Sequence, residues 1–149
     1  MKFKICIIGL GYVGLPLSLE FSKYYNVTGF DKDTQRVKEL NNFFDRNNEF
    51  EKSELKKFKN INITSDKNFL KDCNIFIITV PTPVKKNKTP DLNPLKKSSE
   101  LVGRFLKKKD IVIYESTVYP GCTEDFCVPI LAKYSKLKYK KDFFCGYST

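Results

Sequence analysis

The sequence contains no histidine, although it has 149 residues and five cysteines. Histidine and cysteine are the usual ligands of zinc, and the separation of Cys122 from Cys127 is a poor match to the spacings of zinc-binding cysteines. Five is also an odd number, so the cysteines cannot all pair within the chain. We therefore predict no metal site and reduced thiols, of which Cys6 and Cys145 lie in apolar, strand-like runs and are expected to fill the core.

The sequence also lacks an apolar run long enough to cross a bilayer, which takes about 20 residues. Lys2 and Lys4 precede an apolar stretch, as in a signal peptide, but glycines and Pro16 interrupt it and no small-residue cleavage site follows. We expect no membrane association. A cytoplasmic location follows by default and agrees with the reduced thiols.

Acidic residues are few compared with basic ones, 17 against 27, and the net charge is +10. The lysines are spread over expected loops and polar helix faces, and aromatic residues are not interleaved with them as in a nucleic-acid-binding motif. We interpret the charge as a solvated surface that can attract an anionic nucleotide, and we predict no nucleic-acid partner. The length suits one domain, residues 1–149.

A glycine pattern follows the first apolar run. Residues 3–8 are apolar except for Lys4, and Gly9, Gly11 and Gly14 then have the spacing G-x-G-x-x-G. After a buried parallel strand this pattern indicates a dinucleotide site, although glycines also mark ordinary turns. Gly9 would permit the turn, Gly11 would let the backbone approach a pyrophosphate, and Gly14 would let the next helix pack on the sheet. The phosphates would lie on the amides near Tyr12 and Val13.

An acidic residue ends the second expected strand, residues 27–31. Asp31 follows Gly9 by about 20 residues, the separation expected for a carboxylate that binds the adenosine ribose. A carboxylate there repels a 2′-phosphate, which favours NAD over NADP. Arg36 could serve a 2′-phosphate, but beside Asp31 we assign it to the adenine or ribose side of the pocket. A role for Asp31 as the N-cap of the helix at residues 34–40 is compatible with this.

The remaining pattern predicts an α/β fold, a Rossmann-type doubly wound parallel sheet of about six strands with helices on both faces. Further strands are expected at residues 61–64, 74–80, 110–114 and 142–147. Helices are expected at residues 13–25, 65–72, 95–107 and 123–134, and a helical or irregular excursion at residues 41–60. The loop that begins with Pro81 and the segment at residues 115–121 should meet at the carboxyl edge of the sheet.

Five segments together resemble the NAD-binding domain of the UDP-glucose/GDP-mannose dehydrogenase family. They are Gly9-Leu-Gly-Tyr-Val-Gly-Leu-Pro16, Val80-Pro-Thr-Pro83, Pro90-Asp-Leu-Asn-Pro94, Tyr114-Glu-Ser-Thr-Val-Tyr-Pro-Gly121 and Lys141-Asp-Phe-Phe-Cys-Gly-Tyr-Ser148. The fourth is most similar to UDP-N-acetylhexosamine 6-dehydrogenases of surface-polysaccharide synthesis. The resemblance covers essentially the whole chain.

The resemblance implies oxidation of the sugar's primary alcohol to an acid with two NAD molecules, through a thiohemiacetal and a thioester on a cysteine. It implies that the glycine loop, with Tyr12 and Val13, lines the pyrophosphate, and that Asp31 and Arg36 hold the adenosine half. Val80, Pro81 and Thr82, as far as Pro83, would lie by the nicotinamide ribose. Thr117 matches a threonine beside the nicotinamide that helps to organise the catalytic water, although a strand-end hydroxyl that bonds to backbone is its ordinary interpretation.

The departures from the family pattern concern catalysis. The family's later glutamate, lysine, asparagine and nucleophilic cysteine have no counterpart here, and neither do its central helix and UDP-binding domain. We expect part of a larger dehydrogenase that binds NAD, needs a missing half for the UDP-sugar and does not turn over alone. The alternative is a stand-alone NAD-binding or protein-interaction module from a truncated gene. Sugar identity and oligomer formation are left open.

Overall fold

A six-stranded parallel sheet forms the centre of the protein, which we describe from a computed structural model covering residues 2–116 and 118–148. The strands lie in the order β3-β2-β1-β4-β5-β6, and all five neighbouring pairs are parallel. Their bounds are β1 Lys4–Ile8, β2 Asn26–Phe30, β3 Ile61–Thr64, β4 Ile75–Ile78, β5 Ile111–Tyr114 and β6 Phe144–Tyr147. The predicted doubly wound fold is confirmed, and the order reverses between β1 and β4.

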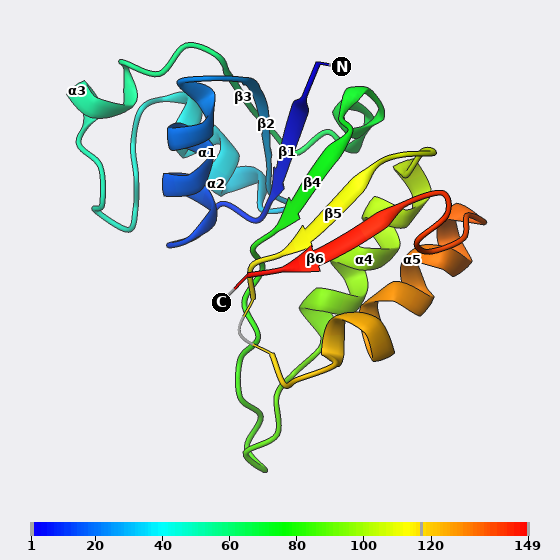
Figure 1. Cartoon of the computed structure of the whole chain (residues 1–149). Coiled ribbons are helices and arrows are strands. Elements are labelled where there is room, and N and C mark those ends of the chain that lie inside the picture. The colour runs from blue at the N-terminus through cyan, green and yellow to red at the C-terminus, as the bar shows by residue number, and fades with distance from the viewer. Residues whose placement is uncertain (1, 117, 149) are drawn as a thin grey trace.

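Helices cover both faces of the sheet (Figure 1). On one side lie α1 and α2, and on the other lie α4 and α5. The helices are α1 Gly14–Ser22, α2 Thr34–Asn41, α3 Lys52–Leu55, α4 Asn93–Phe105 and α5 Val128–Ser135, with a 3-10 helix at Lys67–Asp72 and a π-helical turn at Thr123–Cys127. No helix in the described ranges is long and apolar enough to cross a membrane.

The side chains of β1 show how the two layers are built. Ile5 and Ile7 point into a cluster with α1 and α2, whereas Cys6 and Ile8 point into a second cluster with α4 and α5. Both sides of the strand are buried because successive side chains of a strand face opposite ways, and this explains why its sequence is apolar almost throughout. The core therefore consists of two apolar layers separated by the sheet.

The expected elements are found with small differences at their ends. The excursion at residues 41–60 contains the single turn α3, and the segment expected to be a helix from Ser65 is a 3-10 helix capped by Asp66. The helix expected at residues 123–134 begins as a π-helical turn, and Val128–Ser135 alone is α-helical. Cys6 is fully buried, as predicted, while Cys145 on the edge strand is partly exposed.

Candidate dinucleotide site

A cavity of about 600 Å³ opens at the carboxyl ends of the central strands. In an open α/β sheet this edge, at the point where the strand order reverses, is where ligands bind. The cavity is lined by residues 8–13 and 30–32 after β1 and β2, residues 79–82 after β4, Pro94, Lys97, Ser98 and Leu101 of α4, and Glu115 and Ser116 after β5.

The glycine loop forms the wall of the cavity at the start of α1. Gly9 has φ +98°, a conformation that favours glycine, and its amide donates to Phe30 O at 2.8 Å. A Cβ on Gly14 would lie 1.6 Å from Gly9 O, so helix α1 could not approach the sheet with any other residue there. A Cβ on Gly11 would meet no protein atom within 4 Å, so packing does not require glycine at position 11.

This loop fits a pyrophosphate. The Gly11 Cα faces space that a side chain would otherwise enter. Within the described residues, the backbone amides of Tyr12 and Val13 donate to no backbone acceptor, and both residues are exposed beside the N-terminus of α1. Unpaired amides at a helix N-terminus attract anionic groups. The protein's own backbone therefore supplies a cradle of the kind that dinucleotide cofactors use.

Asp31 lies at the end of β2 and lines the cavity. Its Oδ2 accepts the Leu10 amide at 2.9 Å and its Oδ1 accepts the Asp33 amide at 2.9 Å. These two bonds fix the carboxylate, and each oxygen retains a further lone pair. The N-cap of α2 is Asp33, whose Oδ1 accepts the Gln35 and Arg36 amides, so Asp31 is not the helix cap.

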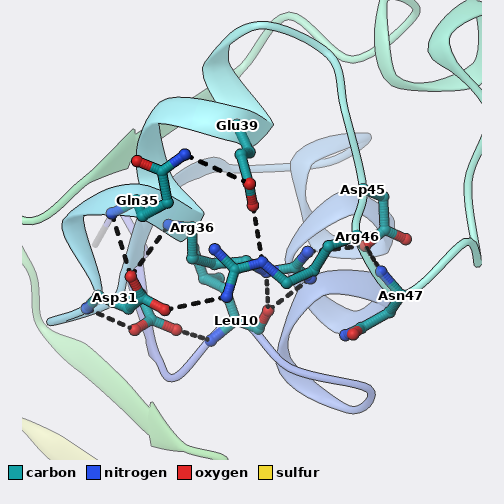
Figure 2. A network of polar contacts seen from close by, with 9 residues as sticks. Leu10, Asp31, Gln35, Arg36, Glu39, Asp45, Arg46 and Asn47 are labelled. Atoms are coloured by element: carbon teal, nitrogen blue, oxygen red, sulfur yellow. Dashed lines mark hydrogen bonds and ion pairs between the residues drawn. The ribbon is translucent and has the colours of Figure 1, made fainter.

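Arg36 lies behind the glycine loop. Its side chain is buried, and it donates from Nε and Nη2 to Leu10 O at 3.0 and 2.8 Å and from Nη1 to Asp45 Oδ1 at 2.7 Å (Figure 2). It is not among the residues that line the cavity. A contact between Arg36 and the adenosine half stays a prediction; the side-chain contacts that the structure provides are with Leu10 of the loop and with Asp45.

Two hydroxyl groups hold neighbouring strand ends together, and neither was singled out in the sequence. Thr79 Oγ1 donates towards the carbonyl oxygens of Ile8 and Gly9, at 3.0 and 2.6 Å, and Ser116 Oγ donates to Val80 O at 2.6 Å. Thr79 directly follows β4 and Ser116 lies two residues after β5, at the edge where the glycine loop was expected, and that position is the sequence signal for them. They fix the spacing of the strand ends around the cavity.

The opposite end of the cavity is where the nicotinamide half was predicted. Val80, Pro81 and Thr82 line it, together with Glu115, which belongs to the segment expected at this edge, and with Lys97 and Ser98, which the sequence did not indicate. Helix α4 contributes Lys97 and Ser98, and its distance from the glycine motif in sequence hides their position at the cavity. Thr117 lies outside the described residues, so its predicted place beside the nicotinamide stays a prediction.

No cysteine is among the described residues that line the cavity. Burial raises the pKa of Cys127 to about 12, with a further contribution from Cys122, and burial likewise raises the pKa of Cys145 to about 12. These two are therefore thiols rather than nucleophilic thiolates at neutral pH. No group of three or more potential metal ligands occurs among residues 2–116 and 118–148.

The strand order, the glycine loop and the carboxylate after β2 together define a Rossmann-type dinucleotide-binding domain of the kind found in dehydrogenases. Residues 3–148 match the NAD binding domain of the UDP-glucose/GDP-mannose dehydrogenase family, and the chain belongs to that family. The expected resemblance is thus confirmed, and NAD is the cofactor of the domain.

Individual relatives agree with this assignment. The chain is 54% identical to a UDP-N-acetyl-D-glucosamine 6-dehydrogenase from Salmonella typhi, over 99% of this chain and 35% of the relative. It is 52% identical to a protein of the same name from Pseudomonas aeruginosa, over 97% of this chain and 34% of the relative. A ternary complex of GDP-mannose dehydrogenase from Pseudomonas aeruginosa superposes with a TM-score of 0.88 at 27% identity, over 96% of this chain and 35% of that one. The chain thus spans about a third of the length of these relatives.

Proposed function

We propose that this chain is the NAD-binding part of a UDP-N-acetylhexosamine 6-dehydrogenase that serves the synthesis of a surface polysaccharide. The whole enzyme would oxidise the C6 alcohol of the sugar to a carboxylate and reduce two NAD molecules. Two relatives that share more than half of their aligned residues with it carry the name UDP-N-acetyl-D-glucosamine 6-dehydrogenase, which supports this substrate class.

The observation that carries the proposal is the arrangement of the cavity. It has a phosphate cradle on one side of the strand reversal and, on the other, a pocket whose lining is mainly apolar and includes the polar side chains of Lys97, Ser98 and Glu115. NAD supplies the hydride acceptor. We assign the pyrophosphate to Gly9, Gly11, Tyr12, Val13 and Gly14. We assign the adenosine ribose hydroxyls to Asp31, because a fixed carboxylate accepts hydrogen bonds from a diol and repels a 2′-phosphate.

At the nicotinamide end we assign binding to residues 80–82 and to Thr117. Lys97 and Glu115 add one positive and one negative side chain at this end of the cavity. Ser116 holds the end of β5 against the loop after β4, through its bond to Val80 O. This contact would keep the width of the pocket constant while the nicotinamide ring enters.

We further propose that the chain binds NAD without oxidising the sugar alone. The thioester route needs a thiolate close to the reacting carbon, and no cysteine lines the cavity among the described residues. Residues beyond this domain would supply the nucleophile and the UDP-sugar contacts. All five cysteines are free, which supports a reducing compartment, the cytoplasm.

Calorimetric titration of the chain with NAD and NADP tests the cofactor assignment. We expect NAD to bind and NADP to bind much more weakly. Asp31→Ala should weaken NAD binding roughly 10- to 100-fold, the equivalent of charged hydrogen bonds worth about 1.5–3 kcal/mol. Asp33→Asn is the matched control, because it removes a neighbouring charge but keeps an N-cap side chain, and NAD affinity should not change.

The substrate class is tested by following NADH absorbance. The chain with UDP-N-acetylglucosamine and NAD should form no NADH, and a fusion with the remaining two-thirds of either relative should form it. Turnover by the isolated chain would contradict the proposed need for an outside nucleophile. An inability of the unaltered chain to bind either dinucleotide would refute the cofactor site.

A further inference from the structure

The backbone of Leu10, inside the glycine loop, is held at both of its peptide groups. Its amide donates to Asp31 Oδ2 at 2.9 Å, and its carbonyl oxygen accepts two hydrogen bonds from the Arg36 guanidinium, at 3.0 and 2.8 Å. Leu10 is fully buried, so water cannot replace either partner. An ordinary loop peptide at the surface has no such constraint.

The guanidinium is itself fixed by a buried carboxylate. Arg36 Nη1 donates to Asp45 Oδ1 at 2.7 Å, and the exposed fractions of the two side chains are 5% and 0%. Burial raises the pKa of Asp45, but the hydrogen bonds from Arg36 and from the amides of Asn47 and Glu49 outweigh this, and its pKa lies below the usual value. Asp45 is therefore a carboxylate at neutral pH.

Asp45 also organises the segment around it. Its Oδ1 accepts the Asn47 amide at 3.0 Å, and its Oδ2 accepts the Glu49 and Phe50 amides at 2.9 and 3.2 Å. None of the residues 42–50 lines the cavity. Figure 2 shows the resulting chain of contacts, which runs from this segment through Asp45 and Arg36 to Leu10.

We propose that Asp45 and Arg36 form a positioning clamp that sets the orientation of the phosphate-binding loop and couples the segment at residues 42–50 to cofactor affinity. This inference rests on the proposed assignment of the pyrophosphate to the loop. Arg36 and Asp45 are positioning residues in this proposal, because they act through Leu10 and neither lines the cavity.

The physical reason is the geometry of the peptide. Leu10 O belongs to the same peptide group as the Gly11 amide, and the amides of Tyr12 and Val13 follow in the next two peptide groups, so rotation of this peptide would redirect those donors. Without the guanidinium, Leu10 O would be a buried acceptor with no donor, and the peptide would turn towards water to regain one. Arginine suits the role because its planar fork bonds Leu10 O twice and Asp45 once, whereas lysine carries a single ammonium group.

The test separates positioning from stability. Breaking one side of a buried ion pair leaves an unpaired charge and destabilises the fold, whereas removing both charges together often does not. The main variant is therefore the double substitution Arg36→Met, Asp45→Asn, with Arg36→Lys as a second variant that keeps the charge and loses the fork. Arg46→Lys is the matched control, because Arg46 bonds Glu39 and Asp33 on the surface and does not contact Leu10.

We expect the double variant and Arg36→Lys to bind NAD about tenfold or more weakly, as misplaced binding groups do, while Arg46→Lys binds as the unaltered chain does. NAD should also slow hydrogen exchange at the Glu49 and Phe50 amides of the unaltered chain, because coupling is reciprocal, and this protection should vanish in the double variant. A folded double variant with unchanged NAD affinity would overturn the proposal. So would an equal loss in Arg46→Lys.

Failure of the proposed function would be seen separately, as an unaltered chain that binds no NAD. The clamp is then tested in the free protein by hydrogen exchange. The quantity measured is the ratio of the exchange rate of the Leu15 amide, which donates to Gly11 O at 3.1 Å, to that of the Ile77 amide in β4. We expect this ratio to rise in the double variant and to stay constant in Arg46→Lys. An unchanged ratio in the double variant would refute the clamp whatever the loop binds.

Discussion

Alanine substitutions at two glycines of the same loop should have different effects: Gly14→Ala should destabilise the fold, whereas Gly11→Ala should weaken NAD binding. Gly14→Ala places a Cβ 1.6 Å from Gly9 O and 2.5 Å from Thr79 Oγ1. Because Gly9 O is a backbone atom, helix α1 must move away from the sheet. Forced overpacking of this kind costs about 1–3 kcal/mol, and the backbone clash places this site at the upper end. For a chain of this size, 2–3 kcal/mol lowers Tm by roughly 4–12 °C.

Gly11→Ala should leave the fold intact and weaken binding. The new Cβ meets no protein atom within 4 Å, and Gly11 does not have a positive φ. Its Tm should therefore be unchanged or slightly higher, since alanine restricts the unfolded chain and can add about 0.4–1 kcal/mol. NAD affinity should nevertheless fall at least about tenfold, because the methyl group enters the space assigned to the pyrophosphate.

Thermal unfolding and calorimetric titration of both variants measure the two effects. Normal NAD affinity in Gly11→Ala would refute the assignment of the pyrophosphate to this wall of the cavity. An unchanged Tm in Gly14→Ala would refute the packing argument. Only the combination of a stable, weakly binding Gly11→Ala and a destabilised Gly14→Ala agrees with both.

Two further predictions concern groups away from the glycines. Ser99 Oγ and Tyr114 Oη lie 2.6 Å apart in the core. Tyr114→Phe or Ser99→Ala alone should cost about 1–3 kcal/mol, because the remaining buried hydroxyl loses its oxygen partner, and both together should cost less than the sum. Urea unfolding of the four proteins measures this, and additive costs would contradict it. The ionised Asp45 has a folded pKa below its unfolded value of about 3.9, so its stabilisation is present above that pH and is lost as the pH falls through the folded pKa. Unfolding of the unaltered chain should thus become steeply easier with acid below pH ~4, and Asp45→Asn should show a flatter dependence.

The sheet could be predicted from the sequence because its signals are local. Apolar runs such as residues 75–78 are buried on both faces. The glycine motif after β1 and Asp31 after β2 identify these two strands as neighbours at the start of the fold. Five β-α repeats with right-handed crossovers then leave few other arrangements. The presence of α4 and the amphipathic face that buries Leu95 and Val102 follow from the same periodicity, whereas its limits, Asn93–Phe105, lie two residues before the expected 95–107.

The direction of the Arg36 side chain could not be predicted, because its partners are far apart in sequence. Position 36 beside Asp31 is equally suited to reach the cavity or the back of the loop. The choice depends on Asp45, which lies in a polar segment with no periodicity and becomes buried only when three amides fold around it. Lys97 was missed for a similar reason, since only the folded sheet brings α4 to the cavity.

The strand order also has a consequence for synthesis on the ribosome. Strand β2 pairs with β1 on one edge and with β3 on the other, and all three belong to the first 64 residues, so one hydrogen-bonding edge of β1 is paired early. The other hydrogen-bonding edge of β1 pairs with β4, which ends at Ile78. Until β4 emerges, the nascent chain carries an unpaired strand edge at the centre of the future sheet, and such edges invite association with other chains. The Leu15-Pro16-Leu17 helix start and the glycine loop thus form beside a half-built sheet, and the cofactor cavity is completed only when the second half of the domain arrives.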